Sequence, residues 1–306
     1  KPVLLTGHHA YKLAVENGWF VKREDGGPAI EMFWGGQGAQ LDFTNAEASN
    51  WWRSNIAEQV LGPGFDIVWN DNNEAELWDE TATIDGFGSA LPGMETRPVH
   101  ALLMTRASRD AMMTHAEDRR PWGSSRAGPI GISRYGETWS GDNKTSWHTL
   151  KWNLRQGLSM ALSGFPFTGH DIGGFDGPPP GPELLVRWFQ MMALHPRCVM
   201  ISWKIHHNNI PNLPWMHEEV FPEIKAAMEL RARFMPLRYT LAHRCHANSE
   251  LMIAPTFYHF DDVACREDSD TFMLGENMLV APVVLEGATD VSVYLPDVAG
   301  GWFDLR

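Results

Sequence analysis

The sequence has little cysteine, an excess of acidic over basic residues and no long hydrophobic run, and each of these scarcities excludes a class of protein. Its three cysteines, Cys198, Cys245 and Cys265, are odd in number and far apart, which argues against a disulfide framework or a structural zinc site. They favour a reducing compartment, so we expect a cytoplasmic protein. The formal charge of −13 argues against nucleic acid and anionic membranes as partners. No apolar stretch approaches the length of a membrane span.

Tryptophan is the residue type that the chain holds in unusual number, with 14 among 306 residues. Four of them lie beside Gly, Asp, Asn or His in loop-like sequence: Trp34, Trp69, Trp139 and Trp203. A flat apolar ring next to hydrogen-bonding groups suits the faces and hydroxyls of a sugar ring. The composition therefore favours carbohydrate as a ligand, while other tryptophans are expected to fill the core.

Strand-like apolar runs alternate with helical stretches along most of the chain. Strands are expected at residues 2–5, 65–70, 129–134, 165–171, 197–203 and 251–257. Helices are expected at residues 45–60, 106–119, 146–162, 181–194 and 218–248. This alternation predicts an α/β fold with a parallel sheet. Because no glycine-rich phosphate loop follows a strand, and polar loops follow several of them, a (β/α)8 TIM barrel is favoured over a doubly wound sheet.

The character of the sequence changes near residue 268. The segments FMLGENMLVAPVVL and VSVYLP, which lie beyond this point, are rich in β-branched residues, interrupted by proline and without helical spacing. We therefore expect a barrel over residues 1–268 and the beginning of a C-terminal β domain over residues 269–306.

Two acidic residues stand in settings that suit catalysis. Asp71 comes directly after the strand expected at residues 65–70, at the end where parallel barrels carry their reactive side chains. Asp142 lies in the glycine-flanked turn of TWSGDNKTSW. Retaining glycoside hydrolysis needs such a pair, one carboxyl as nucleophile and one as general acid/base. On the residues alone, Asp71 could instead cap a helix over residues 74–77, and Asp142 could be an ordinary turn residue.

A series of motifs, in the same order along the chain, resembles the family 31 glycoside hydrolases, a family of retaining α-glucosidases and α-xylosidases. WNDNNE at residues 69–74 is similar to the family's W-x-D-M-N-E, and WSGDN at residues 139–143 is similar to its W-x-G-D-N. Four further segments resemble family motifs: FWGGQGAQLDFTN (33–45), SRA (125–127), FTGHDIGGF (167–175) and SWKIHHN (202–208). The resemblance extends over the whole chain.

The resemblance implies a role for each matching residue. Asp71 would be the nucleophile, and Asp142 the acid/base, of a double displacement through a covalent glycosyl-enzyme intermediate. The matches also imply substrate-binding residues: Trp34, Trp69, Arg126, Trp139, Phe175 and His206. They imply no metal ion and no organic cofactor. The expected partner is a small-molecule or oligosaccharide α-glycoside, and the oligomeric state is left open.

Three departures from the family pattern bear on the substrate rather than on the mechanism. Asn72 replaces the usual methionine after the nucleophile, Lys204 stands where arginine is usual, and Gly7 and His8 replace an Asp-Pro pair. With Lys204, a bidentate contact becomes that of a point charge. The N-N-E sequence after the nucleophile sides with the glucosidase branch, so release of glucose from the non-reducing end of α-glucosides is expected. Another α-glycoside specificity (α-xyloside, α-galactoside or sulfoquinovoside) and transglycosylation stay open.

Two interpretations of another class also stay open. A metal-dependent hydrolase would take its ligands from scattered positions: His8, His9, His170, Asp171, His206 and His207. Adjacent histidines do not easily reach one ion, and no H-x-H or H-E-x-x-H spacing occurs. A non-catalytic carbohydrate-binding barrel would keep the aromatic residues without the chemistry, although both candidate carboxylates are present.

The resemblance further implies an incomplete barrel. The run PVLL at residues 2–5 looks like the third strand of the family's barrel, so about strands 3 to 8 are expected in this chain. A barrel that lacks two strands would expose unpaired backbone edges to water. We therefore expect these residues to be a portion of a longer chain, whose remaining segments are partners of the barrel.

Overall fold

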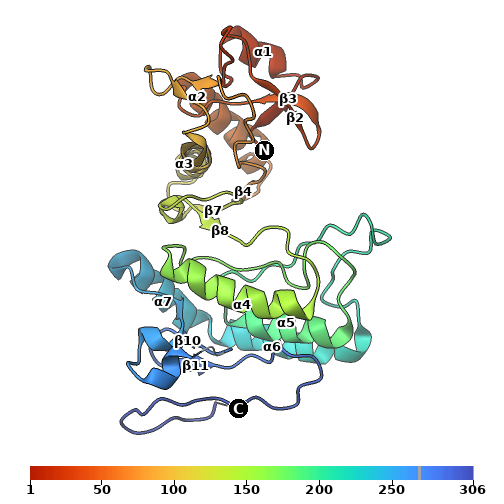
Figure 1. Cartoon of the computed structure of the whole chain (residues 1–306), viewed down its shortest axis with the longest axis vertical. Coiled ribbons are helices and arrows are strands. Elements are labelled where there is room, and N and C mark those ends of the chain that lie inside the picture. Colours follow the sequence, from red (N-terminus) through yellow and green to blue (C-terminus); the bar gives the residue numbers. More distant parts are fainter. Residues whose placement is uncertain (268–269, 306) are drawn as a thin grey trace. The chain divides into compact units, whose positions relative to one another are not determined.

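The structure, a computed structural model, describes residues 1–267 and 270–305, and it divides into two compact units. The first unit is Lys1–Thr138 and the second is Trp139–Arg306; Figure 1 shows the elements of each. The domain boundary expected between residues 268 and 269 lies outside the described residues, as does Arg306, so this boundary stays a prediction. No helix among the described residues is long and apolar enough to cross a membrane.

The first unit begins with an antiparallel sheet of three strands in the order β1-β3-β2. Its strands are β1 (Val3–Leu5), β2 (Ile30–Phe33) and β3 (Gly36–Gln40), and the short helix α1 (Tyr11–Glu16) follows β1. At Gly38 a Cβ atom would lie 2.7 Å from the Leu4 carbonyl oxygen, so only glycine lets β1 and β3 approach this closely. The strand expected at residues 2–5 is therefore confirmed, but its ladder partner here is antiparallel.

Helices α2 (Ala46–Ile56) and α3 (Arg97–His115) pack against each other in the first unit. The helix α2 begins where the Asn45 side chain accepts hydrogen bonds from the amides of Glu47 and Ala48, and it continues as a π-helical turn, Ala57–Leu61. The helix α3 begins nine residues before the expected start at residue 106. Its first turn contains Pro98. An N–H in the first turn has no partner within the helix, so the proline is compatible with a helix start.

A parallel sheet of three strands, in the order β4-β7-β8, completes the first unit. Its strands are β4 (Ile67–Asn70), β7 (Trp122–Ser125) and β8 (Glu137–Thr138), and α3 makes the crossover from β4 to β7. A separate hairpin joins β5 (Thr83–Ile84) and β6 (Leu91–Pro92).

The strand expected at residues 129–134 is wrong, because the strand lies at residues 122–125 instead. Pro129 and the left-handed Gly131 (φ 99°) turn the chain into a 3₁₀ helix, Ile132–Arg134. In the actual strand, WGSS, the tryptophan is followed by a glycine and two serines, so the strand shows no apolar pattern.

The second unit is built around helices that lie side by side in Figure 1: α4 (Trp147–Leu162), α5 (Pro182–Ala193) and α6 (Phe221–Arg233). The hydroxyl of Ser146 caps α4 by accepting a hydrogen bond from the amide of Thr149. The helix expected over residues 218–248 is two helices, because α7 (Met235–Asn248) starts anew after Phe234. Pro236 causes the break, since its ring has no N–H to continue the ladder of α6.

The remaining expected strands are short. Residues 165–171 and 197–203 meet in one parallel bridge, between Asp171 and Val199. The strand expected at residues 251–257 covers β9 (Ile253–Ala254), which pairs antiparallel with β10 (Phe272–Leu274). The third strand of this sheet is β11 (Met278–Val280), in the order β11-β10-β9.

Two histidines lie at the centre of the second unit's core. His170 and His195 are fully buried and cross at 5.9 Å between ring centroids, next to Gly157. Among the residues that the structure describes, neither ring nitrogen of His195 has a hydrogen-bond partner. Burial lowers the pKa of His195 to about 3, and it lowers the pKa of His170 well below its usual value.

We expect His195 to make the protein unstable in acid. The unfolded chain binds a proton at this histidine near pH 6.5 and the folded chain only near pH 3, so the stabilisation is complete above pH 6.5 and is lost as the pH falls below it. The loss amounts to about 2 kcal/mol at pH 5. In urea unfolding at pH 7.5 and pH 5, His195→Leu should therefore lose about 2 kcal/mol less than the wild type does. Equal losses in the two proteins would contradict this assignment.

Candidate functional site

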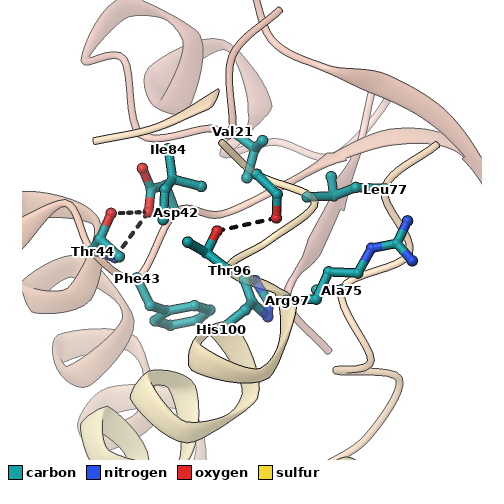
Figure 2. A pocket seen from close by; sticks show the side chains of 11 residues that line it. Val21, Asp42, Phe43, Thr44, Ala75, Leu77, Ile84, Thr96, Arg97 and His100 are labelled. Carbon is teal, nitrogen blue, oxygen red and sulfur yellow. Dashed lines mark hydrogen bonds between the residues drawn. The ribbon is translucent and has the colours of Figure 1, made fainter. Parts of the chain in front are cut away.

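A small cavity in the first unit is lined by Asp42, Phe43 and Thr44 of the DFTN segment, and Figure 2 shows these side chains around it. The cavity is too small for a sugar. Its volume is about 10 Å³, roughly the space of one water molecule. The Asp42 carboxylate accepts hydrogen bonds from the Thr44 amide (2.9 Å) and the Asp85 amide (2.6 Å). The ring of His100 lies edge-on to Phe43 at 5.2 Å. These buried contacts fix the loop after β3, and we assign them no catalytic part.

Asp71 lies on an irregular loop that leaves the carboxyl end of β4. The loop forms no helix between residues 71 and 82, and it passes through left-handed conformations at Asn72 (φ 50°) and Ala75 (φ 54°). Asparagine adopts this conformation readily, whereas it is uncommon for alanine. The alternative that Asp71 caps a helix over residues 74–77 is therefore wrong.

Buried amides tie the loop of Asp71 to the loop that follows β7. The side chain of Asn73, which is fully buried, donates to Ser125 Oγ at 2.9 Å and accepts from the Ala127 amide at 2.9 Å. The Arg126 amide donates to the Asn70 carbonyl oxygen at 2.9 Å. Asp71 and Arg126 thus sit on neighbouring strand ends whose loops are joined by direct hydrogen bonds.

Charged side chains surround the Asp71 carboxylate. Its Oδ1 lies 3.5 Å from Arg126 Nη1, and its Oδ2 lies 3.3 Å from Lys1 Nζ. Lys1 Nζ also lies 5.1 Å from the ring centroid of Trp34, whose side chain is 79% exposed. In the first unit, Asp71, Arg126 and Lys1 thus form one charged cluster, with the Trp34 ring next to Lys1. Trp69, another expected binding residue, lies on the exposed face of β4.

Glu74 also belongs to this cluster, although the family motifs imply no role for it. Its Oε1 accepts a hydrogen bond from Arg126 Nε at 2.5 Å, while another nitrogen of the same guanidinium faces Asp71. Arg126 therefore bridges two carboxylates three residues apart. The signal was present in the sequence, because Glu74 is the last residue of the WNDNNE motif.

We expect Asn73→Ala to destabilise the first unit by about 1–3 kcal/mol, since Ser125 and the Ala127 amide would lose their buried partner. Urea unfolding at neutral pH measures this change. Asn50→Ala is the matched control: exposed Asn50 accepts a surface hydrogen bond of 2.7 Å from exposed Arg53, so its replacement should cost no more than about 0.5 kcal/mol. Equal losses for the two variants would contradict the bridging role of Asn73.

Asp142 lies in a bend of the second unit, between Gly141 and the start of α4. Gly141 is left-handed (φ 76°), and the next residue after Asp142, Asn143, anchors the bend. The Asn143 Oδ1 atom accepts a hydrogen bond of 2.7 Å from Asn153, a buried residue of α4. Asp142 itself is exposed. The structure thus places Asp142 in a bend next to a left-handed glycine, as the glycine-flanked sequence predicts.

The loop of Phe175 lies directly against the loop of Asp142. The Phe175 amide donates to the Asn143 carbonyl oxygen at 2.7 Å, and the Phe175 carbonyl oxygen accepts from the Trp203 amide at 2.9 Å. Three loops therefore run side by side, and the third carries His206, which is exposed. The second unit thus brings the segments of Asp142, Phe175 and His206 together.

A buried ion pair lies next to the ring of Trp139. The guanidinium of Arg197 lies 5.5 Å from the Trp139 ring centroid, and its Nη1 lies 3.1 Å from Asp171 Oδ1. Both charged side chains are 1% exposed. Asp171 is thus paired with Arg197. Within residues 1–267 and 270–305, no three His, Cys, Asp or Glu side chains gather as a metal site would require.

Comparison with known proteins places both parts of the chain in one family. The family model described as the Glycosyl hydrolases family 31 TIM-barrel domain matches residues 1–241. The model of the Glycosyl hydrolase family 31 C-terminal domain matches residues 249–306. The expected fold, a TIM barrel followed by a C-terminal domain, is thereby confirmed.

Individual relatives are similar over nearly the whole of this chain. A protein of Arabidopsis thaliana named "Probable glucan 1,3-alpha-glucosidase" is 32% identical over 97% of this chain and 33% of its own length. "Neutral alpha-glucosidase C" of Mus musculus is 31% identical, over 97% of this chain and 34% of its own. The solved structure of a Flavobacterium johnsoniae GH31 dextranase complexed with glucose is 26% identical and has a TM-score of 0.88, over 97% of this chain and 38% of that one. The chain thus spans about a third of the length of the curated relatives that it matches.

Proposed function

Since the chain belongs to glycosyl hydrolase family 31, we propose that it carries the catalytic residues of a retaining α-glucosidase, which releases glucose from the non-reducing end of α-glucosides. The observation that carries the proposal is the setting of Asp71. This carboxylate stands at the end of a parallel strand, flanked by Arg126 at 3.5 Å and Lys1 at 3.3 Å, on a loop held by buried Asn73. The names of the two relatives, both α-glucosidases, support glucose as the sugar.

The proposed reaction is a double displacement. Asp71 attacks the anomeric carbon while Asp142 gives a proton to the leaving oxygen, so that a covalent glycosyl-enzyme forms and the alcohol departs. Asp142, now ionised, takes a proton from water, and that water displaces Asp71 from the anomeric carbon. Each displacement inverts the anomeric centre, so the product keeps the α configuration. The mechanism requires the two carboxyl groups to stand about 5–5.5 Å apart during the reaction.

The proposed binding residues supply apolar faces and charge around the reacting ring. Trp34, with its exposed ring beside Lys1, suits stacking on a sugar face. Arg126 contacts both the nucleophile Asp71 and Glu74, and its donors also suit sugar hydroxyls. In the second unit, the proposal assigns four residues to binding or catalysis: Trp139, Asp142, Phe175 and His206.

Two further proposals concern the setting of the enzyme. The name "glucan 1,3-alpha-glucosidase" of one relative supports an oligosaccharide as the physiological substrate. The three cysteines, Cys198, Cys245 and Cys265, are free thiols, which supports a reducing, cytoplasmic location.

A panel of aryl α-glycosides tests the proposed function on the full-length protein. The panel contains the glucoside, xyloside, galactoside and sulfoquinovoside, and we expect the highest kcat/KM for the glucoside. A higher kcat/KM for another sugar would show that the enzyme has a different substrate specificity within the family. The absence of turnover on all four would refute the proposed glycosidase activity and favour a non-catalytic carbohydrate-binding barrel.

A further inference from the structure

Lys204 is a buried cation of the second unit whose partners are loop atoms. Its side chain is 4% exposed, and its ammonium group lies 2.8 Å from Thr145 Oγ1. Three backbone carbonyl oxygens complete its surroundings, those of Gly174 (3.1 Å), Asp176 (3.3 Å) and Pro178 (3.4 Å). The sequence predicts a point charge at this position, and in the structure the Lys204 ammonium points into the protein.

The acceptors of Lys204 belong to the loops that carry the proposed site residues. Thr145 lies three residues after Asp142, and Gly174 and Asp176 flank Phe175. Lys204 itself lies two residues before His206. Its ammonium therefore stands at the junction of three loops.

Backbone and side-chain hydrogen bonds also join these loops, and the Lys204 ammonium lies where they meet. The Thr145 amide donates to the Asp176 carbonyl oxygen at 2.9 Å, and Thr145 Oγ1 lies 2.8 Å from the Gly173 carbonyl oxygen. Residues Gly173 and Gly174 have left-handed backbones (φ 82° and 80°). Such a loop has little regular structure of its own, so its conformation depends on what binds its carbonyl groups.

The burial of Lys204 has an energetic cost. Removal from water lowers the pKa of its ammonium to about 8, while the nearby charge of Asp176 acts in the opposite direction. At neutral pH the group is still charged, and its three protons face four acceptors. Charge-assisted hydrogen bonds of this kind are about twice as strong as neutral ones, so they stabilise the loop junction.

We propose that Lys204 is a positioning residue for the glycosylation step: it holds the loop of Asp142 against the loops of Phe175 and His206 and thereby aims the acid/base carboxyl at the leaving oxygen. The proposal rests on the proposed function, because it takes Asp142 as the acid/base. A misplacement of about 1 Å in such a group costs on the order of 10²-fold in rate. The loss should appear only where the leaving group needs a proton.

The kinetic test compares Lys204→Met with the wild type on two substrates in the full-length protein. The leaving group of maltose is the 4-oxygen of a glucose unit, a poorly acidic alcohol that must be protonated, whereas the fluoride of α-glucosyl fluoride departs with little protonation. We expect kcat/KM for maltose to fall by about 10²-fold and kcat/KM for the fluoride to change little. Lys225→Met is the matched control, because Lys225 lies exposed on α6, in a surface ion pair with Glu229. This control should leave both values unchanged.

Amide hydrogen exchange tests the loop junction without using activity. In Lys204→Met, peptides that cover residues 143–145 and 172–178 should exchange faster, while peptides of α6 should not. Unchanged exchange in these loops would overturn the junction. Equal kinetic losses on maltose and fluoride would overturn the positioning role. A wild type without glycosidase activity would instead refute the proposed function and the role in glycosylation with it, and the exchange result would still decide whether Lys204 joins the loops.

Discussion

Asp71→Ala is expected to abolish turnover of every α-glycoside, including α-glucosyl fluoride. Without the carboxylate no glycosyl-enzyme can form, and a better leaving group cannot replace a missing nucleophile. The loss should be on the order of 10⁶-fold, as for covalent nucleophiles in other hydrolases. Initial rates on the fluoride and on an aryl α-glucoside measure it.

Asp66→Ala is the control for this experiment. Asp66 precedes β4 on the same segment but lies exposed, in an ion pair of 2.8 Å with exposed Arg119. Its replacement should leave kcat unchanged, because exposed pairs contribute little to stability. In the wild type, a deactivated fluorosugar substrate should add the mass of one glycosyl group to the peptide that contains Asp71. Appreciable turnover by Asp71→Ala, or labelling of another peptide, would remove Asp71 from the nucleophile's role.

Asp142→Ala is expected to lower kcat/KM on natural α-glucosides by about 10²–10⁴-fold, the usual contribution of a general acid. The loss in the glycosylation step should be much smaller for α-glucosyl fluoride, since fluoride departs without a proton. This dependence on the leaving group separates a proton donor from a residue that only supports the fold. Equal losses on all substrates would show that Asp142 is an ordinary turn residue of its bend.

Azide provides a second test of the Asp142 variant. Without a general base, water attacks the glycosyl-enzyme slowly, whereas azide needs no deprotonation and can enter the space that the carboxyl leaves. The expected product is the α-glycosyl azide, formed with restored turnover. Formation of the β-azide would indicate a single displacement and contradict the proposed mechanism.

Much of the fold could be predicted where local sequence chemistry decides the structure. The helices expected at residues 146–162 and 181–194 are confirmed as α4 and α5, whose starts carry a capping hydroxyl and a first-turn proline. The strand β7 could not be found, because WGSS is held by its neighbours in the sheet rather than by an apolar pattern. The break at Pro236 was readable in principle, but the strong helical composition on both sides concealed it.

The candidate site shows the same division. The motifs bring Asp71 and Arg126 into one site, but only Asp71 is predicted at a strand end, because β7, the strand that leads to Arg126, shows no apolar pattern. The second contact of Arg126 is with Glu74, on a loop whose left-handed Ala75 no propensity indicates. Lys204 was recognised as a departure from the family, yet its direction into the loops depends on where Gly174 and Asp176 place their carbonyl groups.

The anomeric configuration of the first product tests the central claim most directly. Hydrolysis of an aryl α-glucoside by the full-length protein can be followed by proton NMR within the first minutes, before mutarotation mixes the anomers. The double displacement predicts that α-glucose appears first and that β-glucose grows in only as mutarotation proceeds. Initial release of β-glucose would contradict the account.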